Sequence, residues 1–194
     1  GFGPAEAGAF PGVELPMPEA CCGRLDEFFM QHVRRLLGAR RTVSLHSRLA
    51  MVTLPGEQLR PIQRVCHRDR LSVPDGEMAA ACVAYLFDDP SLGGTSFFRP
   101  RKSPAQTEAL MRALAAMPGA EADRVLGAGA GYLAQSNAWF ELVCTVPAAW
   151  NRAIFYDGSI FHSSHVTEAA RLSPDPALGR LTLNGFFVFR RQAA

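Results

Sequence analysis

The run RVCHRDRLSV, residues 64–73, places His67 two positions before Asp69. The run is predicted to be a β-strand, and side chains two apart on a strand point to the same face. An imidazole and a carboxylate that project together can take two neighbouring positions on a metal ion. A third ligand from another strand would complete the facial triad of a non-heme Fe(II) oxygenase. An HxD pair alone is a weak signal, because such pairs also arise by chance.

Two histidines in the stretch YDGSIFHSSHV, His162 and His165, are candidates for that third ligand. They lie three positions apart, so on a regular strand they point to opposite faces. We therefore expect one of them to point inward and the other outward.

A late stretch, GRLTLNGFFVFR, places Arg180, Thr182 and Asn184 on one face of a predicted strand. An arginine that points into a β-structure is costly to bury unless it meets an anion, and its planar fork suits a carboxylate. The anion could come from a ligand or from a neighbouring Asp or Glu of the chain, and the second case is the commoner one for a lone arginine.

Three other motifs are excluded. The triplet HRD also occurs in the kinase catalytic loop, but Pro74 stands where that loop has asparagine. The glycine-rich run at 127–131 does not meet the GxGxxG pattern of a dinucleotide fold and is predicted to be a flexible turn. No G-x-S-x-G nucleophile elbow supports Ser-His-Asp hydrolysis.

The composition bounds the function class. The chain has 194 residues, 48% of them hydrophobic, which is enough for one domain with a substantial core. A net charge of +2 without basic runs does not indicate a nucleic-acid partner. The five cysteines lack CxxC spacing, which suits a reducing cytoplasm. No apolar run approaches the roughly 18 residues of a membrane span, no signal peptide is seen, and a start without Met is typical of a trimmed or tagged chain.

Two helices are predicted. Apolar residues recur at helical spacing over residues 20–38, which predicts an outer helix. A second helix is predicted over residues 104–117, where Ser103 and Gln106 form a capping box. Residues 1–19 hold four prolines and several glycines, and we expect an irregular arm there.

The rest of the chain is predicted to be mainly β. Polar and apolar residues alternate in RTVSLHSRLAMV, residues 41–52. Further strands are predicted at 62–71, 79–88, 95–99, about 139–147, 152–157, 160–166 and 180–190. Many short strands with helices outside favour a single domain over residues 1–194. Its β core would run from about 42 to 190 as a double-stranded β-helix, or jelly roll, with flanking helices.

The order of the motifs resembles the 2-oxoglutarate/Fe(II)-dependent oxygenase superfamily, particularly its prolyl-hydroxylase-like branch. The resemblance covers about residues 60–190 and is carried by the segments CHRDR, VAYLFDDPSLGGTSFF, NRAIFYDGSIFH and GRLTLNGFF. In that family a tyrosine–leucine strand and a GG-x-T-x-F element follow HxD, and here Tyr85-Leu86 and the similar segment LGGTSFF follow it. The combination is far more specific than any single motif.

The resemblance implies a role for each matching residue in iron binding. His67, Asp69 and His162 would hold Fe(II). His162 is preferred to His165, because the family places its distal histidine directly after an apolar strand end. The presence of Asp69 argues against a halogenase, since halogenases of this family leave that position open for halide.

The resemblance also implies a site for the co-substrate 2-oxoglutarate. Arg180 would hold its far carboxylate, and Tyr85 and Thr182 would supply hydroxyls to the same group. With O2 as the other co-substrate, the implied activity is a dioxygenase, by default a hydroxylase of a C–H bond.

Two alternative functions keep the same fold. A jelly-roll ligand-binding module need not use Arg180, and a catalytically silent oxygenase-like protein would keep a partial site. All three ligand types and the arginine are present, so an active enzyme is favoured. We expect a small-molecule or amino-acid-type substrate, and the sequence does not indicate the oligomeric state. Candidates for its pocket, each more often structural or surface residues, are His46, Arg48, Arg101, Asn137 and Trp139.

Overall fold

The computed structural model of the chain describes residues 1–5, 10–69 and 73–191. The strands are β1 (Gly3–Pro4), β2 (Gly12–Pro16), β3 (Ala39–Val52), β4 (Glu77–Tyr85), β5 (Thr95–Pro100), β6 (Phe140–Val146), β7 (Ala153–Asp157), β8 (Phe161–Ser164) and β9 (Arg180–Arg191). The helices are α1 (Glu19–Phe28), which continues as a π-helix over Phe29–Val33, α2 (Pro104–Leu114) and α3 (Gly119–Leu126). None of the helices in this part of the chain is long and apolar enough to cross a membrane.

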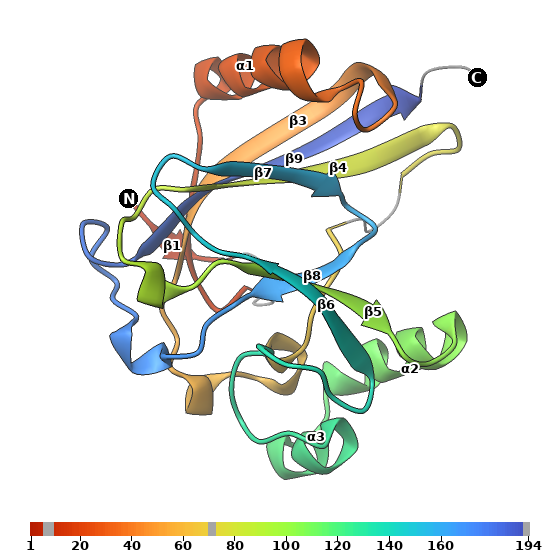
Figure 1. The fold of residues 1–194 in the computed structure, drawn as a ribbon, viewed down its shortest axis with the longest axis vertical. Helices are drawn as coiled ribbons and strands as arrows, with labels where there is room; N and C mark the ends of the chain where they lie inside the picture. Colours follow the sequence, from red (N-terminus) through yellow and green to blue (C-terminus); the bar gives the residue numbers. More distant parts are fainter. Residues whose placement is uncertain (6–9, 70–72, 192–194) are drawn as a thin grey trace.

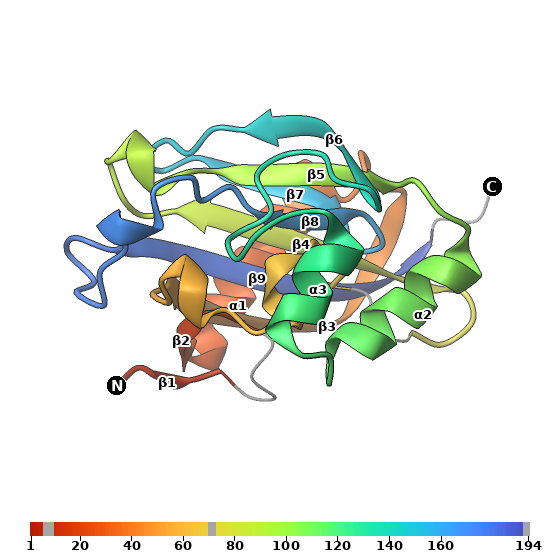
Figure 2. The same cartoon turned by 90° about the horizontal axis from the view of Figure 1, so that it is seen from below.

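The strands form two antiparallel sheets, and the described chain is mainly β (Figure 1). The larger sheet has the order β1-β2-β3-β9-β4-β7, and the smaller has the order β6-β5-β8. Helix α1 lies against the larger sheet, whereas α2 and α3 lie beside the smaller one (Figures 1 and 2). The predicted mainly β architecture with flanking helices is confirmed.

Strand β9 is the centre of the larger sheet, because it pairs with β3 on one side and β4 on the other. Side chains alternate between its two faces. Phe187 and Phe189 point to the side of α1, where Phe29 stacks on Phe187 with ring centroids 4.3 Å apart. The opposite face carries Arg180, Thr182 and Asn184, as the sequence pattern predicts.

The smaller sheet has its own core beneath α2 and α3. The predicted capping box of Ser103 and Gln106 is present, and α2 ends at Leu114, three residues before the predicted end. The buried apolar residues shared by both helices, the sheet and the segment before His67 are Val65, Cys66, Phe98, Leu110, Leu114, Ala122, Leu126, Leu133, Phe140 and Phe161. This core holds the segment that leads into HxD.

The expectation of an irregular arm over residues 1–19 is wrong for Gly3–Pro4 and Gly12–Pro16, which form strands, and residues 6–9 lie outside the described residues. Strand β2 pairs with β3 from Gly12 opposite Val52 to Pro16 opposite Arg48, and β1 pairs with β2. Prolines are tolerated here because they lie in short strands near the sheet edge, where no ladder N–H is needed. The β2 pairing brings Glu14 close to Arg48.

The predicted strand over residues 62–71 is also wrong for the residues that the structure describes. Residues Pro61–Arg64 form a 3-10 helix, and Arg64 ties the turn by donating to the Leu59 carbonyl and to Asp123 of α3. His67 then makes an isolated bridge with His162. Residues 70 and 71 of this prediction lie outside the described part. All other predicted strands are present, with ends shifted by a few residues.

Replacing Phe29 by alanine tests the packing of α1 on the larger sheet. Phe29 is 0% exposed, and its loss should leave a cavity against Phe187 that lowers the free energy of unfolding by about 3–5 kcal/mol. Urea denaturation measures the change. Phe28→Ala is the matched control, since Phe28 is 47% exposed and should lose clearly less. Equal losses at both positions would contradict this packing.

Candidate metal and co-substrate site

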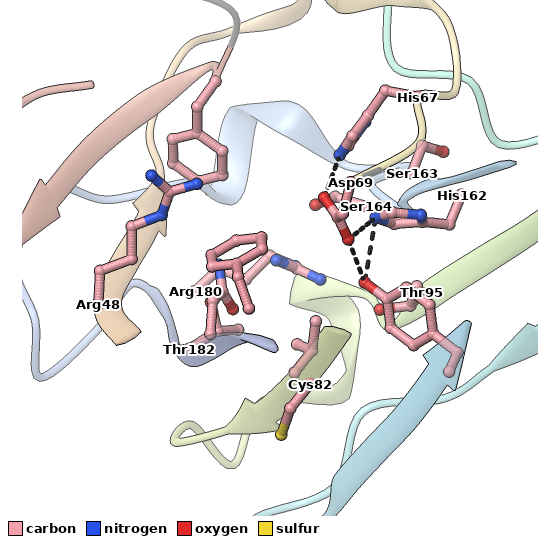
Figure 3. Close-up of a pocket in the computed structure, with 15 residues that line it drawn as sticks. Arg48, His67, Asp69, Cys82, Thr95, His162, Ser163, Ser164, Arg180 and Thr182 are labelled. Atoms are coloured by element: carbon pink, nitrogen blue, oxygen red, sulfur yellow. Dashed lines mark hydrogen bonds and ion pairs between the residues drawn. The ribbon is translucent and has the colours of Figure 1, made fainter. Parts of the chain in front are cut away.

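A cleft between the two sheets gathers most of the residues singled out in the sequence (Figure 3). Its lining comes from both sheets and from the HxD segment, so the cleft depends on how the sheets face each other. The lining residues are Phe10, Arg48, His67, Asp69, Cys82, Val83, Thr95, Tyr156, His162, Ser163, Ser164, Arg180, Thr182, Asn184 and Phe186.

His67, Asp69 and His162 form a cluster whose ligand atoms all lie within 4.8 Å of one another. The Asp69 carboxylate lies between the rings: Oδ1 is 3.6 Å from Nε2 of His67, and Oδ2 is 3.2 Å from Nε2 of His162. Two backbone hydrogen bonds of 2.9 Å join His67 and His162. The HxD segment therefore reaches β8 through a single bridge, without the regular strand that the spacing predicts.

His162 and His165 point to different surroundings. Nδ1 of His162 donates to the carbonyl of Ile160 at 3.0 Å, which leaves Nε2 facing Asp69. Nδ1 of His165 instead lies 2.8 Å from Oγ of Ser96. The structure thus places His162 in the cluster and His165 outside it.

Asp69 and His162 have the protonation states that metal ligands need. Burial alone would raise the pKa of Asp69, but the two histidines and a hydrogen bond from Tyr156 lower it to about 2. Burial lowers the pKa of His162 to about 4, and repulsion from His67 acts in the same direction. At neutral pH the carboxylate is ionised and His162 is neutral. Two imidazoles and one carboxylate are the donor set of a non-heme Fe(II) facial triad, so the residues present fit this metal.

Tyr156 is a member of the site that the sequence analysis missed. Its hydroxyl donates to Oδ2 of Asp69 at 3.2 Å and lies 3.0 Å from Nε2 of His162. Burial, followed by the nearby charge of Asp69, raises the pKa of Tyr156 well above its ordinary value, so the phenol keeps its proton. Tyr156 lies opposite Ala81 on β4, and this pairing turns its side chain into the cleft. A tyrosine within the apolar strand AIFYD was the available signal.

Arg180 is buried at the other side of the cleft, with 3% exposure. Its Nε donates to the carbonyl of Gly93 at 3.2 Å and its Nη2 to that of Gly94 at 2.6 Å. Burial lowers its pKa to about 10, which still leaves the guanidinium charged at neutral pH. No carboxylate of the described residues forms an ion pair with it. The commoner case for a lone arginine, an Asp or Glu partner from the same chain, is therefore not found among the described residues.

The two glycines explain the LGGTSFF element. A Cβ on Gly94 would lie 1.9 Å from the carbonyl oxygen of Val146, and one on Gly93 would lie 1.7 Å from that of His165. Gly93 also has a positive φ of 77°, which side chains rarely adopt. Only glycines can bring these two carbonyls to Arg180 between β5, β6 and β8.

The sequence matches one known protein family over most of its length. Residues 1–187 match a family described as a family of unknown function, DUF6445. The chain belongs to DUF6445. No protein with a curated function matches it in sequence.

Two solved structures match the chain at low similarity. A prolyl-4-hydroxylase from Pseudomonas putida has 18% identity and a TM-score of 0.43, with 99% of this chain and 78% of that one covered. AviO1 from Streptomyces viridochromogenes Tue57 has 15% identity and a TM-score of 0.40, with 100% and 73% covered. Both scores lie below 0.5, so the function has to be inferred from the site itself.

The remaining candidates for co-substrate contact in this DUF6445 member differ in position. Thr182 lines the cleft, and its Oγ1 donates to the Ala50 carbonyl at 3.2 Å. Tyr85 is fully buried behind the lining, and its hydroxyl donates to Oγ1 of Thr95 at 2.8 Å. Thr95 itself lines the cleft and was not singled out in the sequence. The roles of Tyr85 and Thr182 stay predictions.

Some of the residues predicted to line the substrate pocket lie at the cleft and others do not. Arg48 lines the cleft, and His46 stacks on Phe186 of the lining with centroids 5.1 Å apart. Asn137 and Trp139 lie elsewhere: the Asn137 side chain accepts from the backbone N–H of Trp139, whose indole donates to the carbonyl of Val125. Arg101 is exposed and does not line the cleft.

Metal binding at the cluster is tested by titrating Fe(II) into the protein anaerobically in a calorimeter. Asp69→Ala should lower the affinity by more than about 100-fold, because an anionic ligand is lost. Tyr156→Phe should lower it by about 10-fold, as is typical when a group that orients a ligand is removed. Asp75→Ala, at an exposed position, is the control and should bind like the parent. Unchanged binding by Asp69→Ala would place the metal elsewhere.

Proposed function

We propose that this protein is a non-heme Fe(II) and 2-oxoglutarate-dependent dioxygenase of the prolyl-hydroxylase-like branch, which hydroxylates a C–H bond of a small-molecule or amino-acid-type substrate. One observation carries the proposal. A buried cation, Arg180, without a carboxylate partner among the described residues, shares a cleft with a His-Asp-His cluster. A ligand that joins them needs an anion at one end and metal-binding oxygens at the other.

The chemistry of 2-oxoglutarate meets both requirements. Its keto acid end can chelate a metal, and its far carboxylate matches a guanidinium. Burying an uncompensated charge is costly, so the site around Arg180 favours binding of a carboxylate. Thr182, two residues along β9 on the same face, also lines the cleft, and we expect it to contact the same carboxylate.

The arrangement of the sheets supports a jelly roll. The two antiparallel sheets enclose the cleft between them, and the bridge between His67 and His162 adds the HxD segment beside β8, next to the smaller sheet. In a double-stranded β-helix the site lies between such sheets at one end. The motif order HxD, LGGTSFF, His, Arg agrees with this fold.

The division of labour follows from the residues. Bound Fe(II), with 2-oxoglutarate and O2, supplies the oxidation: one oxygen atom enters the substrate C–H bond, and 2-oxoglutarate gives succinate and CO2. The chain supplies position. Arg180 orients the co-substrate, and the Tyr156 hydroxyl holds the Asp69 carboxylate. The sheets cover His162 and most of Asp69, whereas the His67 side chain stays exposed.

The co-substrate assignment is tested without oxygen. Adding Fe(II) and then 2-oxoglutarate should produce the weak visible absorption band of the chelate. Arg180→Met should lower the 2-oxoglutarate affinity by at least about 30-fold, the equivalent of about 2 kcal/mol for a lost partner of a buried charge pair. Arg99→Met, at an exposed position of β5, is the matched control.

The outcomes separate the candidate functions. A band in the parent and slow succinate release after admitting O2 support the enzyme. Bound iron without any band would exclude 2-oxoglutarate and favour a ligand-binding jelly roll. A band without succinate under O2 would indicate a catalytically silent oxygenase-like protein.

A further inference from the structure

Arg48 and Asn184 lie on the same face of the larger sheet and both line the cleft. They are paired residues in the ladder between β3 and β9. The Cβ atoms of such a pair lie about 4.5–5.5 Å apart, so one small ligand can contact both side chains. Figure 3 shows Arg48 across the cleft from His67 and His162. Neither residue belongs to the proposed iron or 2-oxoglutarate contacts.

The guanidinium of Arg48 is held in a fixed plane. Its Nε lies 2.9 Å from Oε1 of Glu14 on β2, and its central carbon lies 4.5 Å above the ring of Phe186. His46 stacks on the same ring with an interplanar angle of 19°. Contacts of this kind cut the entropy that a ligand must overcome when it orders an arginine.

The two terminal nitrogens of Arg48 remain available to a ligand. The ion pair with Glu14 uses Nε, and no hydrogen bond or ion pair joins Nη1 or Nη2 to another described residue. The side chain is 34% exposed, so a ligand can reach it. A pair of parallel N–H groups is the geometry that binds a carboxylate in bidentate fashion.

Asn184 offers the complementary group. Its Oδ1 is buried and has no hydrogen-bond partner among the described residues. A buried acceptor without a partner is unfavourable, and an N–H group of a ligand in the cleft would satisfy it. The two terminal N–H groups of Arg48 beside the Asn184 acceptor therefore match a ligand whose carboxylate and nitrogen are attached to the same carbon.

We propose that Arg48 and Asn184 bind the carboxylate and the amino group of the substrate, which is a free α-amino acid. The inference rests on the proposed function, because it concerns the substrate half of the same cleft. It narrows the substrate class: a residue within a peptide has neither a free α-carboxylate nor a free α-amino group, and a neutral small molecule leaves the Arg48 fork unused. The substrate carbon to be oxidised then belongs to the side chain of the amino acid.

Binding is tested in the anaerobic complex with Fe(II) and 2-oxoglutarate. The probes are the common L-amino acids, each beside its α-amide, which lacks the carboxylate charge. At least one acid should shift the visible band and speed succinate release once O2 is admitted, and its amide should do neither. Arg48→Gln should lower the affinity for that amino acid by about 10- to 100-fold. The affinity of Arg48→Lys should lie between that of Arg48→Gln and that of the parent.

Two further variants keep the result interpretable. Asn184→Leu should lower the affinity for the same amino acid by at least about 5-fold, because the acceptor for its amino group is lost. It should not lower the thermal stability, because the acceptor that it removes is buried and unpaired in the free protein. Arg41→Gln, at an exposed position of β3, should bind both ligands like the parent. All variants should keep the band formed with 2-oxoglutarate alone, so a parent without that band refutes the proposed function and not only this inference.

The contrary outcomes are equally defined. If no amino acid shifts the band, or if the amides act as well as the acids, the substrate is not recognised by its carboxylate and the proposal falls. Loss of the 2-oxoglutarate band in Arg48→Gln would overturn it as well, because Arg48 would then serve the co-substrate.

Discussion

The buried charge of Arg180 is the constraint on which the rest of the site depends. The guanidinium is held by two carbonyls, those of Gly93 and Gly94, whose approach allows no side chain because Val146 and His165 lie directly against them. The turn before β5 is therefore fixed against β9, and β8 pairs with β5 alongside it. Because β8 carries His162, the cation and the His-Asp-His cluster are positioned by one continuous set of contacts.

The same strand couples this site to the hydrophobic core. One face of β9 packs on Phe29 through Phe187, and the other face carries Arg180 and Asn184 into the cleft. A slip of one residue in the pairing of β9 would exchange these faces, placing phenylalanines in the cleft and a charged arginine beneath α1. Both consequences are unfavourable, so the packing of α1 and the polar lining specify the same register.

Sequence patterns predicted the parts of the structure that local periodicity determines. Alternation located β9 and the face of Arg180, and the capping box located α2. The pattern did not show that Pro61 and the side chain of Arg64 turn the chain before His67, because a turn and a short strand bury similar apolar residues. Tyr156 was missed since its role arises from a contact with Asp69 across 87 positions of sequence.

In the proposed function, the two arginines of the cleft give it two anion-binding ends. Arg180 and Asn184 lie four residues apart on β9, about 13 Å at the rise of an extended strand, and Arg48 is the neighbour of Asn184. Two anions bound in one cleft repel each other, so a cation at each end favours their binding together. Glu14 pairs with Arg48 but no described carboxylate pairs with Arg180. The buried end of the cleft at Arg180 thus favours a ligand group with a full negative charge. The more exposed end at Arg48 suits a group whose charges nearly balance, as in an amino acid.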